Sequence, residues 1–83
     1  MVVHGRVQGV FFRDACARRA RAEGVVGTVR NRSDGTVHAR FEGPADAVGR
    51  LVAWCREGPS HAEVAGVDVV EVSPTGLESF RIQ

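Results

Sequence analysis

The sequence of 83 residues carries 11 Arg and no Lys against 10 Asp and Glu, which gives a formal net charge of +1 at pH 7. This near-neutral charge gives no electrostatic reason to expect nucleic acid or a membrane surface as a partner. No stretch approaches the ~20 apolar residues that cross a bilayer, and the first residues lack the pattern of a signal peptide. We therefore expect a cytoplasmic protein whose residues 1–83 form a single domain with a modest core.

The first predicted elements are a strand at residues 3–7 and a helix at residues 12–23. Apolar and polar residues alternate in the strand segment. The helix segment contains neither Gly nor Pro, and it has an apolar face made by Phe12, Ala15, Cys16 and Ala20. Gly24 is suited to end this helix, because glycine readily adopts the left-handed conformation that is common at helix C-termini.

Two strands joined by a tight turn are predicted next, at residues 25–31 and 36–42. The second of them alternates most clearly, with Val37, Ala39 and Phe41 on one face. The sequence SDGT at residues 33–36 favours a hairpin, because Asp-Gly suits the positive φ angles of a tight turn.

The rest of the chain is predicted to form a second helix and two more strands. Gly43-Pro44 is suited to the start of the helix and Gly58-Pro59 to its end. The apolar face of this helix is made by Val48, Leu51, Val52 and Cys55. Residues 64–72 are predicted as a fourth strand, and residues 79–82 as a short last strand.

This order of elements predicts a ferredoxin-like fold, an α/β sandwich of the α+β type with the pattern βαββαβ. Each helix connects two strands, and right-handed crossovers place both helices on one face of the sheet. We expect the sheet to be mainly antiparallel. Cys16 and Cys55 fit no metal-binding spacing, so we expect two reduced, buried thiols in preference to a disulfide.

The stretch GRVQGVFFR, residues 5–13, places two glycines and an apolar run directly before the first predicted helix. A loop that leads into a helix N-terminus offers unpaired backbone N–H groups and the positive end of the helix dipole, which together bind anions. Arg13 would add a two-pronged donor for phosphate oxygens. The alternative is a glycine turn beside a solvated Arg, and the nucleotide P-loop pattern GxxxxGK[ST] is absent.

Asn31 is the only Asn of the chain, and it lies at the end of the second predicted strand. That strand runs parallel to the first, so the C-terminal ends of both lie on the same side of the sheet, where open α/β sheets tend to bind ligands. A neutral amide near the glycine loop would hold a water molecule by donating and accepting hydrogen bonds. The alternative is an Asn that is present for its turn chemistry.

These motifs resemble those of the acylphosphatase family. Residues 5–13 look like the family's signature loop, and GVVGTVRNRSDGTV at residues 24–37 is similar to its second motif, which carries the active-site Asn. Further similarity lies at Gly58-Pro59, Ala62, Val64 and Phe80-Arg81-Ile82, so the resemblance covers essentially the whole chain. One departure is Thr28, where the family usually has Trp, which puts the local packing in doubt more than the chemistry.

The resemblance implies hydrolysis of the carboxyl-phosphate bond of acyl phosphates, which gives a carboxylate and inorganic phosphate. It implies that Arg13 binds and orients the phosphate and that Asn31 positions the attacking water. The phosphoryl oxygens would be cradled by the backbone N–H groups of Gln8, Gly9, Val10, Phe11 and Phe12. Asp14 suits the helix N-terminus as a partner of the dipole.

The implied reaction needs no metal and no cofactor, and the expected partners are small acyl phosphates and inorganic phosphate. The three histidines, His4, His38 and His61, are scattered, which favours surface positions over metal ligands. A monomer is expected for so small a domain with no obvious apolar patch.

There are two alternative functions. An RNA-binding module of the same fold lacks the aromatic residues that its central strands need. A catalytically silent anion-binding module would bind phosphate without turnover.

Overall fold

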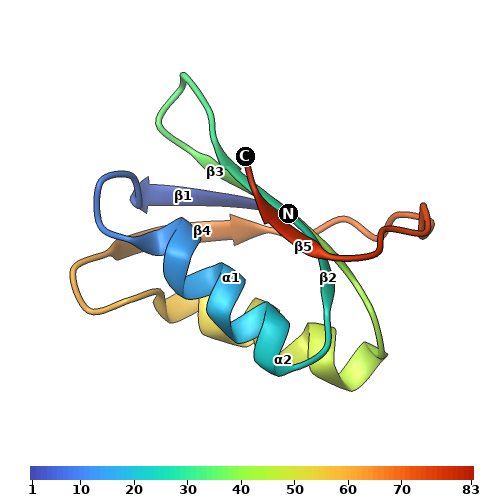
Figure 1. The fold of residues 1–83 in the computed structure, drawn as a ribbon. Helices are drawn as coiled ribbons and strands as arrows, with labels where there is room; N and C mark the ends of the chain where they lie inside the picture. The colour runs from blue at the N-terminus through green and yellow to red at the C-terminus, as the bar shows by residue number, and fades with distance from the viewer.

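The computed structural model describes residues 1–83 and contains five strands, two helices and one mixed sheet (Figure 1). The strand order in the sheet is β4-β1-β3-β2-β5. The elements in chain order are β1 (Val2–Arg6), α1 (Phe12–Ala22), β2 (Val26–Asn31), β3 (Val37–Glu42), α2 (Ala45–Glu57), β4 (Glu63–Asp68) and β5 (Phe80–Ile82). The ferredoxin-like βαββαβ fold predicted from the sequence, with its short last strand, is confirmed.

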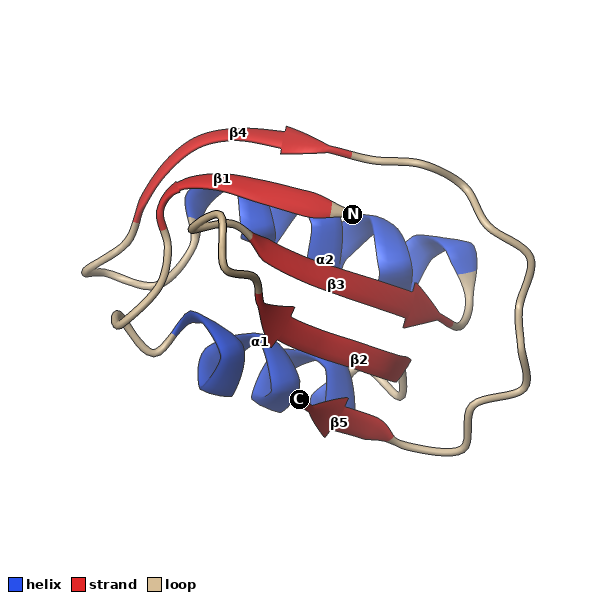
Figure 2. Cartoon of the chain, turned by 90° about the horizontal axis from the view of Figure 1, so that it is seen from above, coloured by secondary structure: helices blue, strands red, loops and turns tan.

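Both helices cover one face of the sheet, as the view from above shows (Figure 2). β3 lies between β1 and β2 and is antiparallel to both, so β1 and β2 run parallel without touching. The only parallel pair of neighbours is β2 with β5. This arrangement brings the C-terminal ends of β1, β2 and β5 to the same side, next to the start of α1. Neither helix is long and apolar enough to cross a membrane.

The core fills the space between the helices and the sheet. Its buried apolar side chains come from every element except β4, with Phe12 and Leu51 among the largest. Cys16 and Cys55 are both buried and form no disulfide, as the sequence predicted. Contact with Cys16 and burial raise the pKa of the Cys55 thiol, so Cys55 is an inert packing group.

The end of α1 follows from a glycine, as predicted. Gly24 has a φ of 71°, and its N–H donates to the carbonyl of Arg21 at 3.2 Å. The next N–H, that of Val25, donates back to the carbonyl of Ala20 at 2.8 Å. These paired bonds satisfy carbonyls at the helix end and turn the chain directly into β2.

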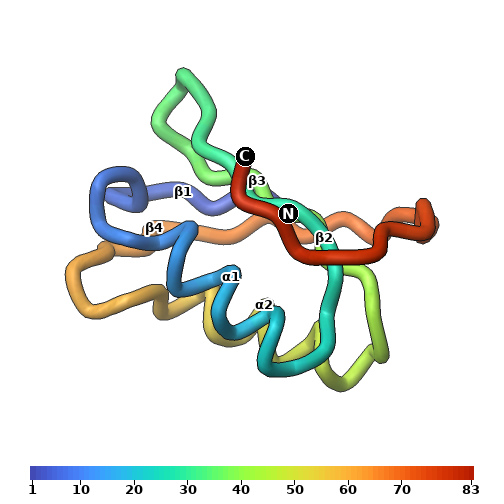
Figure 3. Tube along the Cα trace, viewed as in Figure 1, coloured from blue at the N-terminus to red at the C-terminus, as the bar shows by residue number.

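The predicted fourth strand is too long, because β4 ends at Asp68 instead of at residue 72. Its neighbour β1 begins at Val2, which lies opposite Asp68, so the residues beyond have no strand to pair with. Residues 69–79, here called the strap, swing out past the end of the sheet and return as β5 (Figure 3). The strap exposes Val69, Val70 and Val72 by 48, 71 and 55%.

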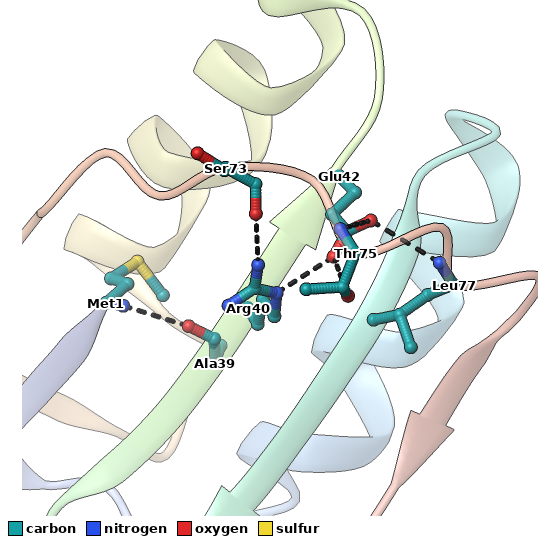
Figure 4. Close-up of polar contacts among 7 residues, drawn as sticks. All are labelled: Met1, Ala39, Arg40, Glu42, Ser73, Thr75 and Leu77. Atoms are coloured by element: carbon teal, nitrogen blue, oxygen red, sulfur yellow. Dashed lines mark hydrogen bonds and ion pairs between the residues drawn. The ribbon is translucent and has the colours of Figure 1, made fainter.

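The strap is held against β3 by one carboxylate, that of Glu42 (Figure 4). Its side chain is only 7% exposed and accepts hydrogen bonds from Arg40 Nε at 2.8 Å and from Thr75 Oγ1 at 2.9 Å. The backbone N–H groups of Thr75 and Leu77 donate to the same carboxylate at 3.1 and 3.4 Å. Arg40 also donates to the carbonyl of Ser73. Local sequence patterns do not reveal this network, because its strap residues lie 33 to 35 positions from their partners on β3.

Candidate active site

A cavity of about 260 Å³ lies where the loop after β1, the start of α1 and the ends of β2 and β5 meet. It brings together the two features singled out from the sequence, Arg13 and Asn31. The other residues that line it are Val7, Gly9, Phe11, Phe12, Asp14 and Ile82. The prediction that Asn31 approaches the glycine loop is therefore correct, because β1 and β2 end on the same side of the sheet.

The backbone N–H groups of residues 7–11, here called the site loop, have no acceptor within the protein. None of them donates to a backbone or side-chain oxygen, and the first bond of α1 runs from the N–H of Ala15 to the carbonyl of Phe11 at 3.1 Å. The N–H groups of the first helical turn are unpaired as well, as at any helix start. The cavity thus lies beside a row of unpaired donors and the positive end of the helix dipole.

Two residues give the site loop its shape. Gly9 has a φ of 73°, and Phe11, which is not a glycine, has a φ of 62° and a ψ of 24°. Phe11 immediately precedes α1 and its side chain makes no capping hydrogen bond. A left-handed conformation at a bulky residue is uncommon and costs about 1 kcal/mol or more, so the surrounding structure imposes it.

Arg13 projects from the first turn of α1 toward the end of β5. Its Nη1 donates to the main-chain oxygen of Gln83 at 3.2 Å, and no Asp or Glu side chain lies within ion-pair distance of the guanidinium. One contact therefore orients the side chain, and no acidic side chain neutralises its charge. Most of its N–H donors remain available to an anion in the cavity.

Asn31 presents an unsatisfied acceptor at the end of β2. Its Oδ1 is buried and has no hydrogen-bond partner. A buried polar atom without a partner costs roughly 1–3 kcal/mol, and the great majority of such atoms in proteins do have one. Asn31 also lines the cavity, so its unpartnered oxygen belongs to a residue of the site.

Gln8 and Val10, two of the five predicted cradle residues, do not line the cavity. The Gln8 side chain points to the β2–β3 hairpin, where its Nε2 donates to the carbonyls of Arg32 at 2.7 Å and Thr36 at 2.9 Å. The Val10 side chain is buried in the core. Both side chains therefore fix the site loop, and only their unpaired backbone N–H groups remain as candidates for binding.

Sequence reasoning missed Ile82 as part of the site. The short β5 pairs in parallel with β2, with Ile82 opposite Val29, and this pairing carries the end of the chain to the cavity. A strand of three residues carries no sequence signal for its neighbour, so only the fold reveals this position. Val7 and Asp14 also line the cavity, as direct neighbours of the residues that were singled out.

The fold and the cavity define a class, a ferredoxin-like α+β protein with a cavity and a row of unpaired backbone donors at the start of its first helix. A family model described as Acylphosphatase matches residues 1–82. An acylphosphatase of Rubrobacter xylanophilus is 60% identical over 89% of this chain and 67% of its own length. One of Anaeromyxobacter dehalogenans is 52% identical over 100% of this chain and 90% of its own. The chain therefore belongs to the acylphosphatase family, a family of hydrolases, as its motifs indicated.

Solved structures give the same result. The crystal structure of acylphosphatase from Bacillus subtilis has a TM-score of 0.94 and 35% identity, over 99% of this chain and 92% of that one. Full-length HypF in the phosphate- and nucleotide-bound form has a TM-score of 0.89 and 27% identity, over 99% of this chain but only 11% of that one. The same fold thus also occurs as a small part of a much larger protein.

Proposed function

We propose that this protein hydrolyses acyl phosphates to a carboxylate and inorganic phosphate in the cavity beside α1. The backbone N–H groups of residues 8–12 and the guanidinium of Arg13 hold the phosphoryl group, and Asn31 positions the attacking water. The observation that carries this proposal is that Asn31, whose Oδ1 is buried without a partner, lines the same cavity as Arg13, which pairs with no Asp or Glu side chain. Family membership supports the type of reaction.

The proposed groups match the charge changes of phosphoryl transfer. In a loose transition state the negative charge lies on the phosphoryl oxygens and on the leaving oxygen. Backbone N–H groups and a guanidinium that are already oriented stabilise this charge without having to reorganise. A carboxylate is a good leaving group, so the reaction requires no strong general acid.

Asn31 acts on the water by accepting one of its hydrogen bonds at Oδ1. This contact aligns a water lone pair with the phosphorus, opposite the leaving carboxylate oxygen. It also satisfies an acceptor that has no other partner in the structure. The proton lost by the water ends on the released phosphate, whose oxygens lie next to the attacking water.

We further propose that the protein acts as a monomer in the cytoplasm, without metal or cofactor, and that residues 1–83 suffice for the reaction. The groups invoked above all lie within residues 8–31, and Gly9, Phe11, Phe12, Arg13 and Asn31 line one cavity. The chemistry requires a held phosphate and an aligned water, and the chain supplies candidates for both.

The test is hydrolysis of benzoyl phosphate by the purified protein in the presence of EDTA, with Arg13→Ala and Asn31→Ala measured in parallel. We expect Arg13→Ala to abolish turnover and inhibition by inorganic phosphate together. Asn31→Ala should lower kcat roughly 10²-fold or more, by analogy with the loss of one preorganised donor, while phosphate inhibition persists. Arg18→Ala, on the exposed side of α1, is the matched control and should keep full activity.

The second candidate is a silent anion-binding module, for which the unpaired N–H groups of the site loop and Arg13 would equally serve. It predicts that the protein binds inorganic phosphate, that Arg13→Ala abolishes this binding, and that no acyl phosphate is hydrolysed. For the proposed hydrolysis, normal turnover of acyl phosphates by Asn31→Ala would show that a group other than Asn31 positions the attacking water.

A further inference from the structure

Phe11 combines two unfavourable features that the proposed chemistry does not require. Its side chain is 73% exposed, and its backbone is in the left-handed conformation that glycine adopts far more readily. The backbone N–H that Phe11 offers to a phosphate would be equally present in a glycine. Neither packing nor backbone preference therefore explains a large aromatic ring at this position, and a contact with a ligand does.

A second exposed apolar side chain lines the same cavity from the other end of the chain. Ile82 of β5 is 39% exposed, and it reaches the cavity through the parallel pairing of β2 and β5. The other apolar residues of the lining, Val7 and Phe12, are only 1 and 2% exposed and belong to the core. The accessible apolar surface of the site thus comes from Phe11 and Ile82.

The cavity is therefore divided chemically. Unpaired N–H groups, Arg13 and the Asn31 oxygen suit the phosphoryl group and its water. The side chains of Phe11 and Ile82 have no hydrogen-bond donor for a phosphate, and they suit an apolar group attached to it. A volume of about 260 Å³, below the range typical of drug-sized ligands, has room for a small substrate with one such group.

We infer that Phe11 and Ile82 form an acyl subsite that selects acyl phosphates with an aromatic or bulky apolar acyl group over acetyl phosphate. This inference rests on the proposed function and adds the substrate class to it. Binding then buries apolar surface that is otherwise exposed to water.

The test compares kcat/KM for benzoyl phosphate with kcat/KM for acetyl phosphate in each variant. Phe11→Asn removes the ring but tolerates the left-handed backbone, and Phe11→Leu keeps an apolar side chain. We expect the ratio to fall on the order of 10-fold in Phe11→Asn and clearly less in Phe11→Leu, as for the loss of apolar contacts in a pocket. Changes that affect both substrates equally cancel in this ratio.

Two further variants complete the design. Ile82→Asn should lower the same ratio, since it removes the other half of the subsite. Val70→Asn is the control, because Val70 is 71% exposed on the strap and does not line this cavity, so the ratio should stay unchanged.

A ratio that Phe11→Asn leaves unchanged overturns the acyl subsite and assigns Phe11 to the shape of the loop alone. That outcome leaves the proposed function intact, because both substrates are then still hydrolysed. If the unmodified protein hydrolyses neither benzoyl phosphate nor acetyl phosphate, the proposed function is overturned, and the acyl subsite is overturned with it.

Discussion

The site loop and the strap are both irregular segments, but they treat their backbone donors in opposite ways. In the strap, the N–H groups of Thr75 and Leu77 donate to the buried carboxylate of Glu42. In the site loop, residues 7–11 leave every N–H without an acceptor. The strap is closed by contacts within the protein, whereas the site loop is open to a ligand of opposite charge.

The site loop is held in one conformation although its backbone N–H groups have no acceptor. Gln8 fastens it to the hairpin through two carbonyls, Val10 inserts into the core, and Gly5 fixes the strand that leads into it. Side chains and a close backbone contact hold the loop, so its N–H groups are fixed in place and still free. A loop whose backbone N–H groups must stay free for a ligand is therefore held rigid by other groups, here its side chains and a close backbone contact.

The largest expected effect on stability comes from a substitution in β1, the strand that leads into the site loop. Gly5 lies at an irregularity of the β1–β4 pairing with a φ of 122°, and a Cβ there would lie 2.1 Å from the carbonyl oxygen of Glu63. Backbone cannot move aside as a side chain can, so we expect Gly5→Ala to lower the free energy of unfolding by about 3 kcal/mol or more. Urea denaturation measures this loss, and a decrease below about 1 kcal/mol would show that β1 and β4 separate easily.

The next largest expected effect comes from removing the charge of Glu42, which holds the strap against β3. Hydrogen bonds from Arg40 and Thr75 hold the pKa of Glu42 at about 2, against an ordinary 4.5. Because the folded pKa is lowered, the ionised carboxylate stabilises the fold above pH 4.5, and this contribution is lost as the pH falls toward 2. We expect Glu42→Gln to lower Tm at pH 7 by roughly 10 °C, a shift that is large for a chain of this size.

The pH dependence of Tm separates this role from a general loss of packing. Between pH 4.5 and 2 the unmodified protein should lose Tm more steeply than Glu42→Gln, so that the two curves converge. Parallel curves would mean that the charge of Glu42 does not hold the strap. Hydrolysis at pH 7 and low temperature should change little, because Glu42 does not line the cavity.

The third effect loosens the site loop without removing any donor. Gln8→Ala deletes the two hydrogen bonds to the hairpin and leaves the backbone N–H groups in the chain. We expect kcat/KM for benzoyl phosphate to fall roughly 10- to 100-fold, since displacement of a binding group by about an ångström weakens catalysis to that extent. Unchanged kinetics with a lower Tm would show that the loop keeps its shape without this contact.

Much of this molecule could be predicted from its sequence, because local patterns fix local structure. The periodicity of residues 12–23, the glycine at 24 and the Asp-Gly turn gave α1, its end and the hairpin. The placement of Asn31 beside the glycine loop followed from strand direction alone. What failed were features decided by partners far along the chain. Residues 69–72 look like strand but find no neighbour to pair with.

Ile82 and Glu42 illustrate the same limit within the site and the strap. Ile82 joins the cavity only because β5 pairs with β2, and Glu42 is buried only because the strap folds over it. Neither position differs locally from an ordinary exposed strand residue. The unsatisfied oxygen of Asn31 is also invisible in sequence, since it is defined by the absence of a partner in space.

The smallest expected effect comes from the same substitution, Gly to Ala, made once in the site loop and once in the strap. It compares the two segments most directly. Gly9 of the site loop and Gly76 of the strap have φ angles of 73° and 77°, and an added Cβ at either would meet no atom within 4 Å. Ala at each position should therefore cost the same small backbone strain, about 1 kcal/mol of unfolding free energy. Only at Gly9 would the new methyl group enter the cavity in which we place the phosphate. We expect Gly9→Ala to raise the inhibition constant for inorganic phosphate several-fold, roughly the effect of one misplaced methyl group, while Gly76→Ala leaves it unchanged. Equal inhibition constants in the two variants, at equal stability, would place the phosphate elsewhere than beside the site loop.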